Sequence, residues 1–267
     1  MQQEPRSQDA APSCFEPLPE EGFQFACHPS VACFNVCCRD LHLVLTPYDV
    51  LRLKRALGLE SGRFLEQYTI PEADPHWGIP VVKMRMLDRE GRPCPFVRPE
   101  GCSVYTDRPA ACRTYPLGRA ARQAPGPEGP QKEERYFLVR EPHCLGFQEN
   151  KRWSLAGWLS DQGLAEYNAW TDRWMAFLSR YRPGAGRDLL DAHWKMFYMA
   201  CYSLDRFREF VFGTRLLLLV DVPDARVQRM RTSDEELLSF ALDWLGFSVF
   251  GAPLFSLRGQ SVHNARP

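Results

Sequence analysis

The spacing of apolar and polar residues changes several times along the chain, and each change predicts an element. Leucines alternate with other residues over 41–45, and this period of two predicts a short, half-buried strand. The run Thr46-Pro47-Tyr48-Asp49 is typical of a helix start, with Thr46 as the capping residue. Apolar residues then fall on one helical face as far as Gly58, which ends the helix. Ser61 is predicted to cap a second short helix through Tyr68.

The middle of the chain alternates between short strand patterns and polar segments. Residues 81–87 and 136–140 are predicted strands. Between them, residues 120–134 are polar and rich in Pro and Gly, which predicts a loop.

Beyond residue 150 the pattern becomes helical. Aromatic residues recur at helical spacing from Trp153 through Tyr181, and a second long helix is predicted over 189–212. The short apolar run 216–220 fits either a strand or a buried loop. Ser233-Asp234-Glu235-Glu236 has the form of a capping box, which predicts a last helix through about residue 247.

These patterns together predict an α+β fold that is mostly helical. We expect a mobile tail over 1–22, a cysteine-rich metal-binding domain over 23–150, a helical portion over 151–255 and a tail over 256–267. The first domain is expected to be an irregular lobe with short strands, on which the C-terminal helical portion packs.

Composition narrows the class of protein. Hydrophobic residues make up 45% and charged residues 25%, which is ordinary for a globular protein. Lys+Arg and Asp+Glu are equal at 33 each, so the chain lacks the basic excess of most nucleic-acid-binding domains. The N-terminal residues are polar and no apolar run approaches the length of a membrane span. We therefore expect a cytoplasmic protein with no nucleic-acid partner and no membrane span.

Cysteine is the most informative residue type in the chain. Eight of the 10 cysteines fall into two clusters. The first contains Cys27, Cys33, Cys37 and Cys38, and the second contains Cys94, Cys102, Cys112 and Cys144. Cys14 and Cys201 lie apart and are interpreted as ordinary small hydrophobic residues. In the reducing cytosol, clustered cysteines are more often metal ligands or catalytic groups than disulfides.

Four thiolates suit either a structural zinc ion or an iron–sulfur cluster. The C-x2-C knuckle that is common in zinc sites is absent, and so are the regular ferredoxin spacings. The sequence favours an iron–sulfur cluster and leaves zinc open. Because Cys37 and Cys38 are adjacent, they are not expected to bind one metal ion in a simple way.

Residues beside Cys112 are candidates for supporting the metal. Thr106 or Asp107 could cap a short helix that carries Cys112, with Arg108 and Arg113 near the sulfur. A site with several thiolates carries negative charge and needs cations or amide donors to stay buried. We therefore predict cofactor-supporting roles for Arg108, Arg113 and Tyr115, and we expect the two cysteine clusters to converge in space.

The cysteine motifs resemble those of a known family. The run Cys27…Cys33…Cys37-Cys38, the segment Cys94-Pro-Phe and the segment 101–116 (GCSVYTDRPAACRTYP) are similar to the bacterial YkgJ-type cysteine-cluster family. That family is described as a zinc- or iron-chelating domain, and the flagellin lysine methylase FliB resembles it in its cysteine cluster. The resemblance implies metal binding over about residues 25–147. The first gap is five residues here, where the family has three.

Three functions follow as hypotheses. The first is a protein that holds an iron–sulfur cluster with a redox or group-transfer role. The second is a zinc-stapled structural or interaction module without catalysis, and the third is an enzyme like the protein lysine methylase. No Gly-rich nucleotide loop follows a strand, so a Rossmann-type cofactor site is not supported. The catalytic residues, the substrate and any protein partner stay open.

Overall fold

The computed structural model describes residues 14–75, 78–124, 131–181 and 191–258. The described chain is α+β and mostly helical, as the sequence predicts, and its C-terminal region is helical. It divides into two compact units, which are described separately here. Unit 1 comprises residues 1–37 and 111–164, and Unit 2 comprises residues 38–110 and 165–267. Most of the predicted tails, over 1–13 and 259–267, lies outside the described residues.

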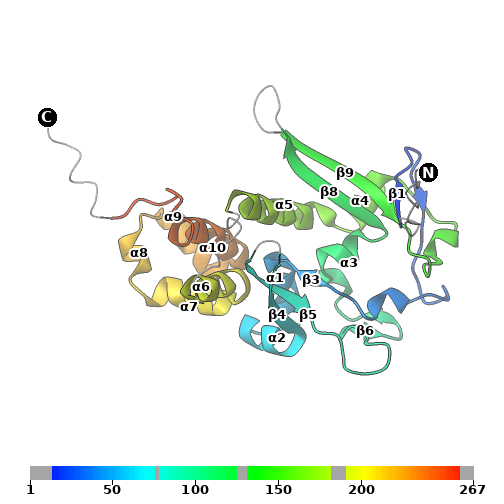
Figure 1. The fold of residues 1–267 in the computed structure, drawn as a ribbon, viewed down its shortest axis with the longest axis horizontal. Coiled ribbons are helices and arrows are strands. Elements are labelled where there is room, and N and C mark those ends of the chain that lie inside the picture. Colours follow the sequence, from blue (N-terminus) through cyan, green and yellow to red (C-terminus); the bar gives the residue numbers. More distant parts are fainter. Residues whose placement is uncertain (1–13, 76–77, 125–130, 182–190, 259–267) are drawn as a thin grey trace, which may run out of the picture. The chain divides into compact units, whose positions relative to one another are not determined.

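Unit 1 is built around a long β-hairpin. Strands β8 (Leu117–Ala124) and β9 (Gln131–Val139) pair antiparallel, and β1 (Phe15–Pro17) pairs with the other edge of β9 (Figure 1). A second, two-stranded sheet joins β2 (Phe23–Gln24) to β10 (Arg152–Trp153). The 3-10 helix η3 (Gly146–Gln148) and helix α4 (Leu155–Asp161) complete the unit. Its small core consists of Phe23, Phe25, Leu117, Leu138, Trp158 and Leu164.

The hairpin corrects the prediction of a loop over 120–134. Residues 120–124 and 131–134 are strand, and residues 125–130 lie outside the described part. This end of the hairpin carries charged residues and alanines but no large apolar side chain, so the sequence shows no strand-like alternation there. Arg122 lies opposite Glu133 in register, and their side chains pair at 2.7 Å. Arg119 pairs with Glu134, also at 2.7 Å. Opposite charges across two antiparallel strands stabilise such a ribbon without large apolar side chains.

Unit 2 begins with a small sheet and two helices. Strands β3 (Val44–Leu45), β5 (Pro80–Met84) and β4 (Thr69–Ala73) pair antiparallel in that order. Helix α1 (Pro47–Ala56) follows β3, and the predicted cap is confirmed, because the Thr46 side chain accepts from the Asp49 amide in a full capping box. Helix α2 (Ser61–Tyr68) is also present. Its N-cap is Glu60 rather than Ser61.

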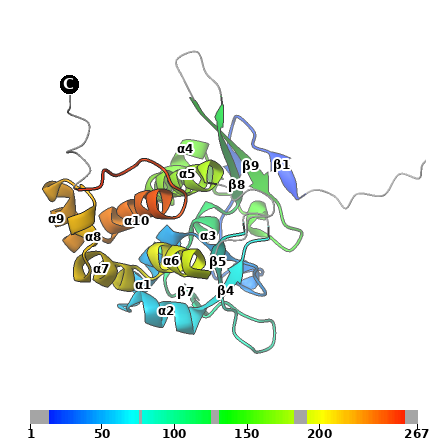
Figure 2. The ribbon, with the colours of Figure 1, turned by 60° about the vertical axis from the view of Figure 1, so that its left-hand side comes forward.

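Five further helices form the larger part of Unit 2. They are α6 (Asp191–Tyr202), α7 (Leu204–Gly213), α8 (Leu216–Leu219), α9 (Asp224–Thr232) and α10 (Asp234–Ser248). Helix α10 packs on α6, α7 and α9 (Figure 2). The predicted helix over 189–212 is interrupted at Ser203, whose backbone is not helical, so it forms α6 and α7. The apolar run 216–220 is a short helix, α8, instead of a strand or loop. Helix α10 has the predicted Ser233 cap.

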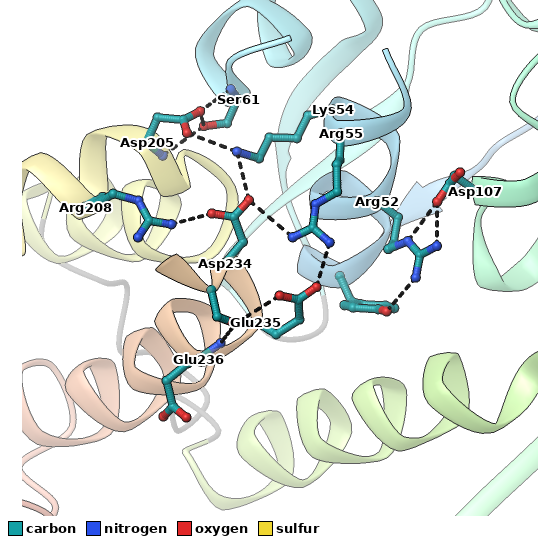
Figure 3. A network of polar contacts seen from close by, with 12 residues as sticks. Arg52, Lys54, Arg55, Ser61, Asp107, Asp205, Arg208, Asp234, Glu235 and Glu236 are labelled. Carbon is teal, nitrogen blue, oxygen red and sulfur yellow. Dashed lines mark hydrogen bonds and ion pairs between the residues drawn. The ribbon is translucent and has the colours of Figure 1, made fainter. Parts of the chain in front are cut away.

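A network of charges links the helices of Unit 2. Lys54 on α1 is only 8% exposed and pairs with Asp205 of α7 at 3.0 Å and with Asp234 of α10 at 3.3 Å (Figure 3). Ser61 donates both its backbone amide and its hydroxyl to the Asp205 carboxylate, which explains why Ser61 does not cap its own helix. Arg208 donates to the other side of Asp234. Acids and bases from three helices, together with Ser61 of α2, thus satisfy one another inside the unit.

Three remaining helices contain residues of both units, and two of these helices carry cysteines. The 3-10 helix η1 (Val36–Cys38) and helix α3 (Ala110–Thr114) both cross the division between the units, as does α5 (Leu164–Arg180). In Unit 2, strands β6 (Val97–Arg98) and β7 (Gly101–Cys102) form a two-residue hairpin ladder, followed by the 3-10 helix η2 (Tyr105–Asp107). Among the helices of the described residues, none has the length and hydropathy needed to cross a bilayer.

Candidate metal centre

The first cysteine cluster lies on a series of tight turns. The amide of Phe34 donates to Val31, and the amide of Val36 donates to Cys33. Between them Asn35 has a φ of 67°, which no helical residue adopts. A regular helical turn therefore does not carry Cys33 and Cys37 on one face. The chain instead enters the short helix η1 only at Val36.

Unit 1 brings Cys144 from the second cluster to three cysteines of the first. The pKa of Cys27 is raised to about 11 by burial and then by the charges of Cys37, Cys33 and Cys144. Such coupling requires the four sulfurs to lie near one another, since the charges of well-separated groups are screened. At neutral pH the Cys27 thiol keeps its proton, and a bound metal would have to displace it.

Backbone amides point at two of these sulfurs. The amide of Leu145 donates to Cys33 Sγ at 3.1 Å. The amide of Gly146 donates to Cys144, and this contact opposes the rise in the Cys144 pKa that burial causes. Amide donors stabilise the negative charge of a thiolate, and hydrogen bonds to sulfur tune iron–sulfur sites.

Tyr115 brings a buried hydroxyl to the same group. Its ring packs edge-on against Phe25, with centroids 5.9 Å apart. The hydroxyl is buried and no partner meets hydrogen-bond geometry. It faces Cys144, and burial followed by this thiol raises the Tyr115 pKa. A buried hydroxyl is costly without an acceptor, and the Cys144 sulfur is the acceptor that Tyr115 faces.

Unit 2 holds a second set of cysteine sulfurs. Cys94 begins a turn in which the Val97 amide donates to the Cys94 carbonyl at 3.1 Å, and Pro95 occupies the position that this turn favours. The amides of Phe96 and Val97 donate to the Cys94 sulfur. The amide of Val104 does the same for Cys102. Burial is the larger influence at both thiols and raises the pKa of each.

The backbone of Cys38 pairs with the backbone of Cys94 in this second set. The Cys94 amide donates to the Cys38 carbonyl at 2.8 Å, and Arg39 pairs with Pro93 in an antiparallel bridge. The structure therefore regroups the cysteines. Cys27, Cys33, Cys37 and Cys144 gather in Unit 1, whereas Cys38, Cys94 and Cys102 gather in Unit 2. Cys112 is exposed on α3, and Cys201 is fully buried in the Unit 2 core.

The predicted supporting arginines are both buried, at 7% exposure each, and have different surroundings. Arg108 lies over the Tyr105 ring at 3.7 Å, and its charge lowers the Cys102 pKa against the effect of burial. Arg113 donates to the Gln162 carbonyl at the end of α4. A role for Arg113 at the metal stays a prediction.

Arg98 was missed by the sequence reasoning, although it follows Cys94 by four residues. Its guanidinium donates to the carbonyls of Pro95 and Val97, at 2.9 and 2.8 Å, and its charge lowers the pKa of Cys94 and of Cys102. The Cys94-Pro95 turn was the sequence signal that could have identified Arg98. In such a turn the backbone amides point at the cysteine sulfur, and the carbonyls are free to accept hydrogen bonds from a cationic side chain.

Within the described ranges, no three His, Cys, Asp or Glu side chains lie close enough together to enclose a metal ion as they stand. The thiols form groups whose charges interact, without a completed ligand cage. A cysteine side chain has one rotatable bond before its sulfur, so convergence on an ion requires rotation about that bond. The chemistry of the donors, which are thiols with amide groups directed at them, fits a thiophilic metal.

Comparison with known proteins agrees with this donor set. Residues 26–145 match the family model CxxCxxCC, described as "Putative zinc- or iron-chelating domain". This confirms the cysteine-cluster resemblance. The CxxCxxCC segment contains all eight clustered cysteines. Its gaps before the double cysteine are five and three residues, where the family name has two. No curated protein and no solved structure matches the chain. The match supports metal binding by this segment.

Proposed function

We propose that Unit 1 holds an iron–sulfur cluster through Cys27, Cys33, Cys37 and Cys144. The single observation that carries this proposal is the buried Tyr115 hydroxyl, which faces the Cys144 sulfur inside the group of four thiols. When bound, an iron–sulfur cluster supplies one-electron transfer.

The residues of this chain have separate tasks around the cluster. The four thiolates supply the protein ligands. The Leu145 and Gly146 amides spread the negative charge of the sulfurs, as hydrogen bonds to cluster sulfurs do in general. The Tyr115 hydroxyl would add one further donor and so stabilise the more negative, reduced state.

The proposal favours iron–sulfur over zinc because of the number and kind of donors. The absent C-x2-C knuckle argues against a structural zinc ion. The sulfur atoms of an iron–sulfur cluster can accept hydrogen bonds from several amides and from one buried hydroxyl. A single zinc ion in the same place remains the competing assignment, since the family description names both metals.

Anaerobic expression and purification tests the assignment. We expect iron and acid-labile sulfide in equal amounts, visible charge-transfer absorption and a paramagnetic signal on reduction. Cys27→Ser and Cys144→Ser should lose at least half of the iron, whereas Cys14→Ser, which changes a cysteine outside both groups, should keep it. Zinc without sulfide in the parent protein would refute the cluster.

Tyr115→Phe gives a second test that does not depend on activity. The variant keeps the ring and its contact with Phe25 and removes only the hydroxyl. We expect the cluster to remain bound and its reduction potential to fall, because one donor to sulfur has gone. An unchanged potential would mean that the hydroxyl does not act on the cluster.

A further inference from the structure

Exposed leucines gather on one surface of Unit 2. Helix α8 leaves Leu218 and Leu219 exposed, at 68% and 59%. After α10, Leu254 and Leu257 are exposed at 41% and 38%. The two pairs belong to neighbouring segments, because the Arg258 amide donates to the Leu219 carbonyl at 2.8 Å. We call these four leucines the leucine patch, and an apolar patch of this kind usually marks a binding surface.

The segment after α10 is held firmly on that helix. The chain turns back after α10 and runs along it (Figure 2). The Phe255 ring packs against Phe240 and Phe247, with centroids 5.4 and 5.6 Å apart. Gly246 leaves room for Leu254, whose Cδ1 would lie only 2.9 Å from a Cβ atom at that glycine. The exposed leucines of this segment therefore stand on a fixed support.

A hollow of about 400 Å³ lies beside this segment. Phe247, Phe255 and Leu257 form its large apolar walls, and the rest of its lining consists of small residues between 251 and 256. None of the lining residues is charged. A hollow of this size and character accepts an apolar side chain. The surface thus combines a recess with protruding leucines of α8.

The backbone at Leu257 forms an open strand edge. In the short antiparallel ladder, the Arg258 amide donates to Leu219 and the Asp221 amide donates to the Ser256 carbonyl, at 2.8 Å each. In this pattern the N–H and C=O of Leu257 point to the opposite edge. Neither group has a backbone partner among the described residues. Such an edge pairs readily with another extended chain.

Charges around the leucine patch distinguish between possible occupants. Arg258 and Asp221 lie 3.5 Å apart and are both exposed. Arg215 precedes α8 and Asp224 begins α9, and both are exposed as well. These four charges sum to zero, which does not favour an anionic membrane or a nucleic acid. A rim with both signs is complementary to itself, because a cation of one copy can face an acid of another.

We propose that the leucine patch is the interface of a homodimer, so that its occupant is a second copy of this chain. A twofold axis places the same patch on both copies, and the two open edges at Leu257 then run antiparallel and pair with each other. The protruding leucines of α8 have a hollow on the other copy to enter. The net charge of the chain is zero, so the two copies do not repel each other through their overall charge.

Sedimentation velocity of the full chain tests the proposal, with a reductant present so that disulfides cannot link the copies. Between about 1 and about 300 µM, the parent protein should pass from monomer to dimer without larger species. Leu218→Asp should raise the dissociation constant at least about tenfold, because the burial of one leucine contributes about that factor and each dimer contains the change twice.

Met175→Asp is the matched control, because it places the same charge on another exposed apolar residue of Unit 2, at 44% exposure. It should dimerise as the parent does. A parent protein that stays monomeric over the whole concentration range would overturn the proposal. Equal weakening by Met175→Asp and Leu218→Asp would also overturn it, since the effect would then not depend on the patch.

Hydrogen exchange locates the interface without any variant and so covers the case in which Leu218→Asp fails to fold. The peptide over 254–258 should exchange at least about threefold more slowly at the highest protein concentration than at the lowest, because the open edge becomes paired. Helix α6 is the internal control and should exchange at the same rate at both concentrations. A dimer that protects other segments and leaves 254–258 unchanged would refute the assignment of the patch.

A lipid surface is the competing occupant, and vesicles separate it from a second copy. The parent protein is mixed with phosphatidylcholine vesicles with and without phosphatidylserine, and bound protein is measured by co-sedimentation. We expect no binding to either, because the rim of the patch carries no net charge. A monomeric protein that binds the vesicles and loses this binding in Leu218→Asp would overturn the homodimer.

Discussion

Asp205→Asn should destabilise Unit 2 by about 2 kcal/mol, although the change removes no apolar surface. Lys54 is 8% exposed and lies 3.0 Å from Asp205 Oδ1 (Figure 3). Two unit charges at that distance attract by about 5 kcal/mol at an effective dielectric constant of about 20. The net loss is smaller, because Asp205 is 34% exposed and Lys54 keeps its contact with Asp234 at 3.3 Å. Asn also retains one oxygen for Ser61.

The assay is urea unfolding of the full chain, followed by circular dichroism at pH 7. Asp191→Asn is the matched control, since Asp191 pairs with Lys195 at 2.6 Å in the same unit but both side chains are more than 70% exposed. Exposed pairs of this kind contribute about 0.5 kcal/mol or less. Equal losses in the two variants would refute the argument that burial makes the Lys54 pair strong.

A double-mutant cycle isolates the interaction itself. Lys54→Met removes the cation and keeps most of the side-chain volume. If Lys54 and Asp205 stabilise each other, the combined variant should be more stable than the sum of the two single losses predicts, by about 1 kcal/mol or more. Additive losses would show that each residue acts through other contacts.

Three further predictions concern stability and thiol ionisation. Burial raises the pKa values of Asp205 and Glu236, but hydrogen bonds from Ser61 to Asp205 and from arginines to Glu236 outweigh it, so both pKa values are lowered. The stability that these two carboxylates give the folded protein is complete above their unfolded pKa values, near about 4, and is lost as the pH falls through the folded values. Measuring the unfolding midpoint over an acid titration checks this. Phe207→Ala, at a fully buried position, should cost about 3–5 kcal/mol in urea unfolding, whereas Leu218→Ala, at 68% exposure, should cost under about 0.5 kcal/mol. Arg108→Ala should raise the pKa of the Cys102 thiol further, because the Arg108 charge lowers this pKa against the effect of burial; the pH dependence of Cys102 alkylation checks this, with Arg258→Ala as a surface control.

Local sequence patterns were sufficient to predict the helices that begin with a clear N-cap residue. The Thr46 capping box and the Ser233 cap depend on residues within three positions of the cap, so sequence alone determines them. The same holds for the metal chemistry, because eight clustered cysteines and the CxxCxxCC match require no tertiary information.

Elements that depend on distant partners were not predictable in this way. The charged hairpin of β8 and β9 has no apolar alternation, and its register depends on pairs such as Arg122 with Glu133. Ser61 is a good capping residue by type, but Asp205, 144 positions along the chain, takes both of its hydrogen bonds.

The sequence by itself determined that this protein carries clustered thiols of the kind that bind metals, because ligand type and number are properties of the residues. Only the tertiary structure decided which thiols gather together. Cys144 joins Cys27 across more than a hundred residues, and Cys38 lies with Cys94 although its neighbour Cys37 does not. The physical reason is that backbone pairing and the direction of each side chain, which sequence spacing does not encode, set the distances between sulfurs.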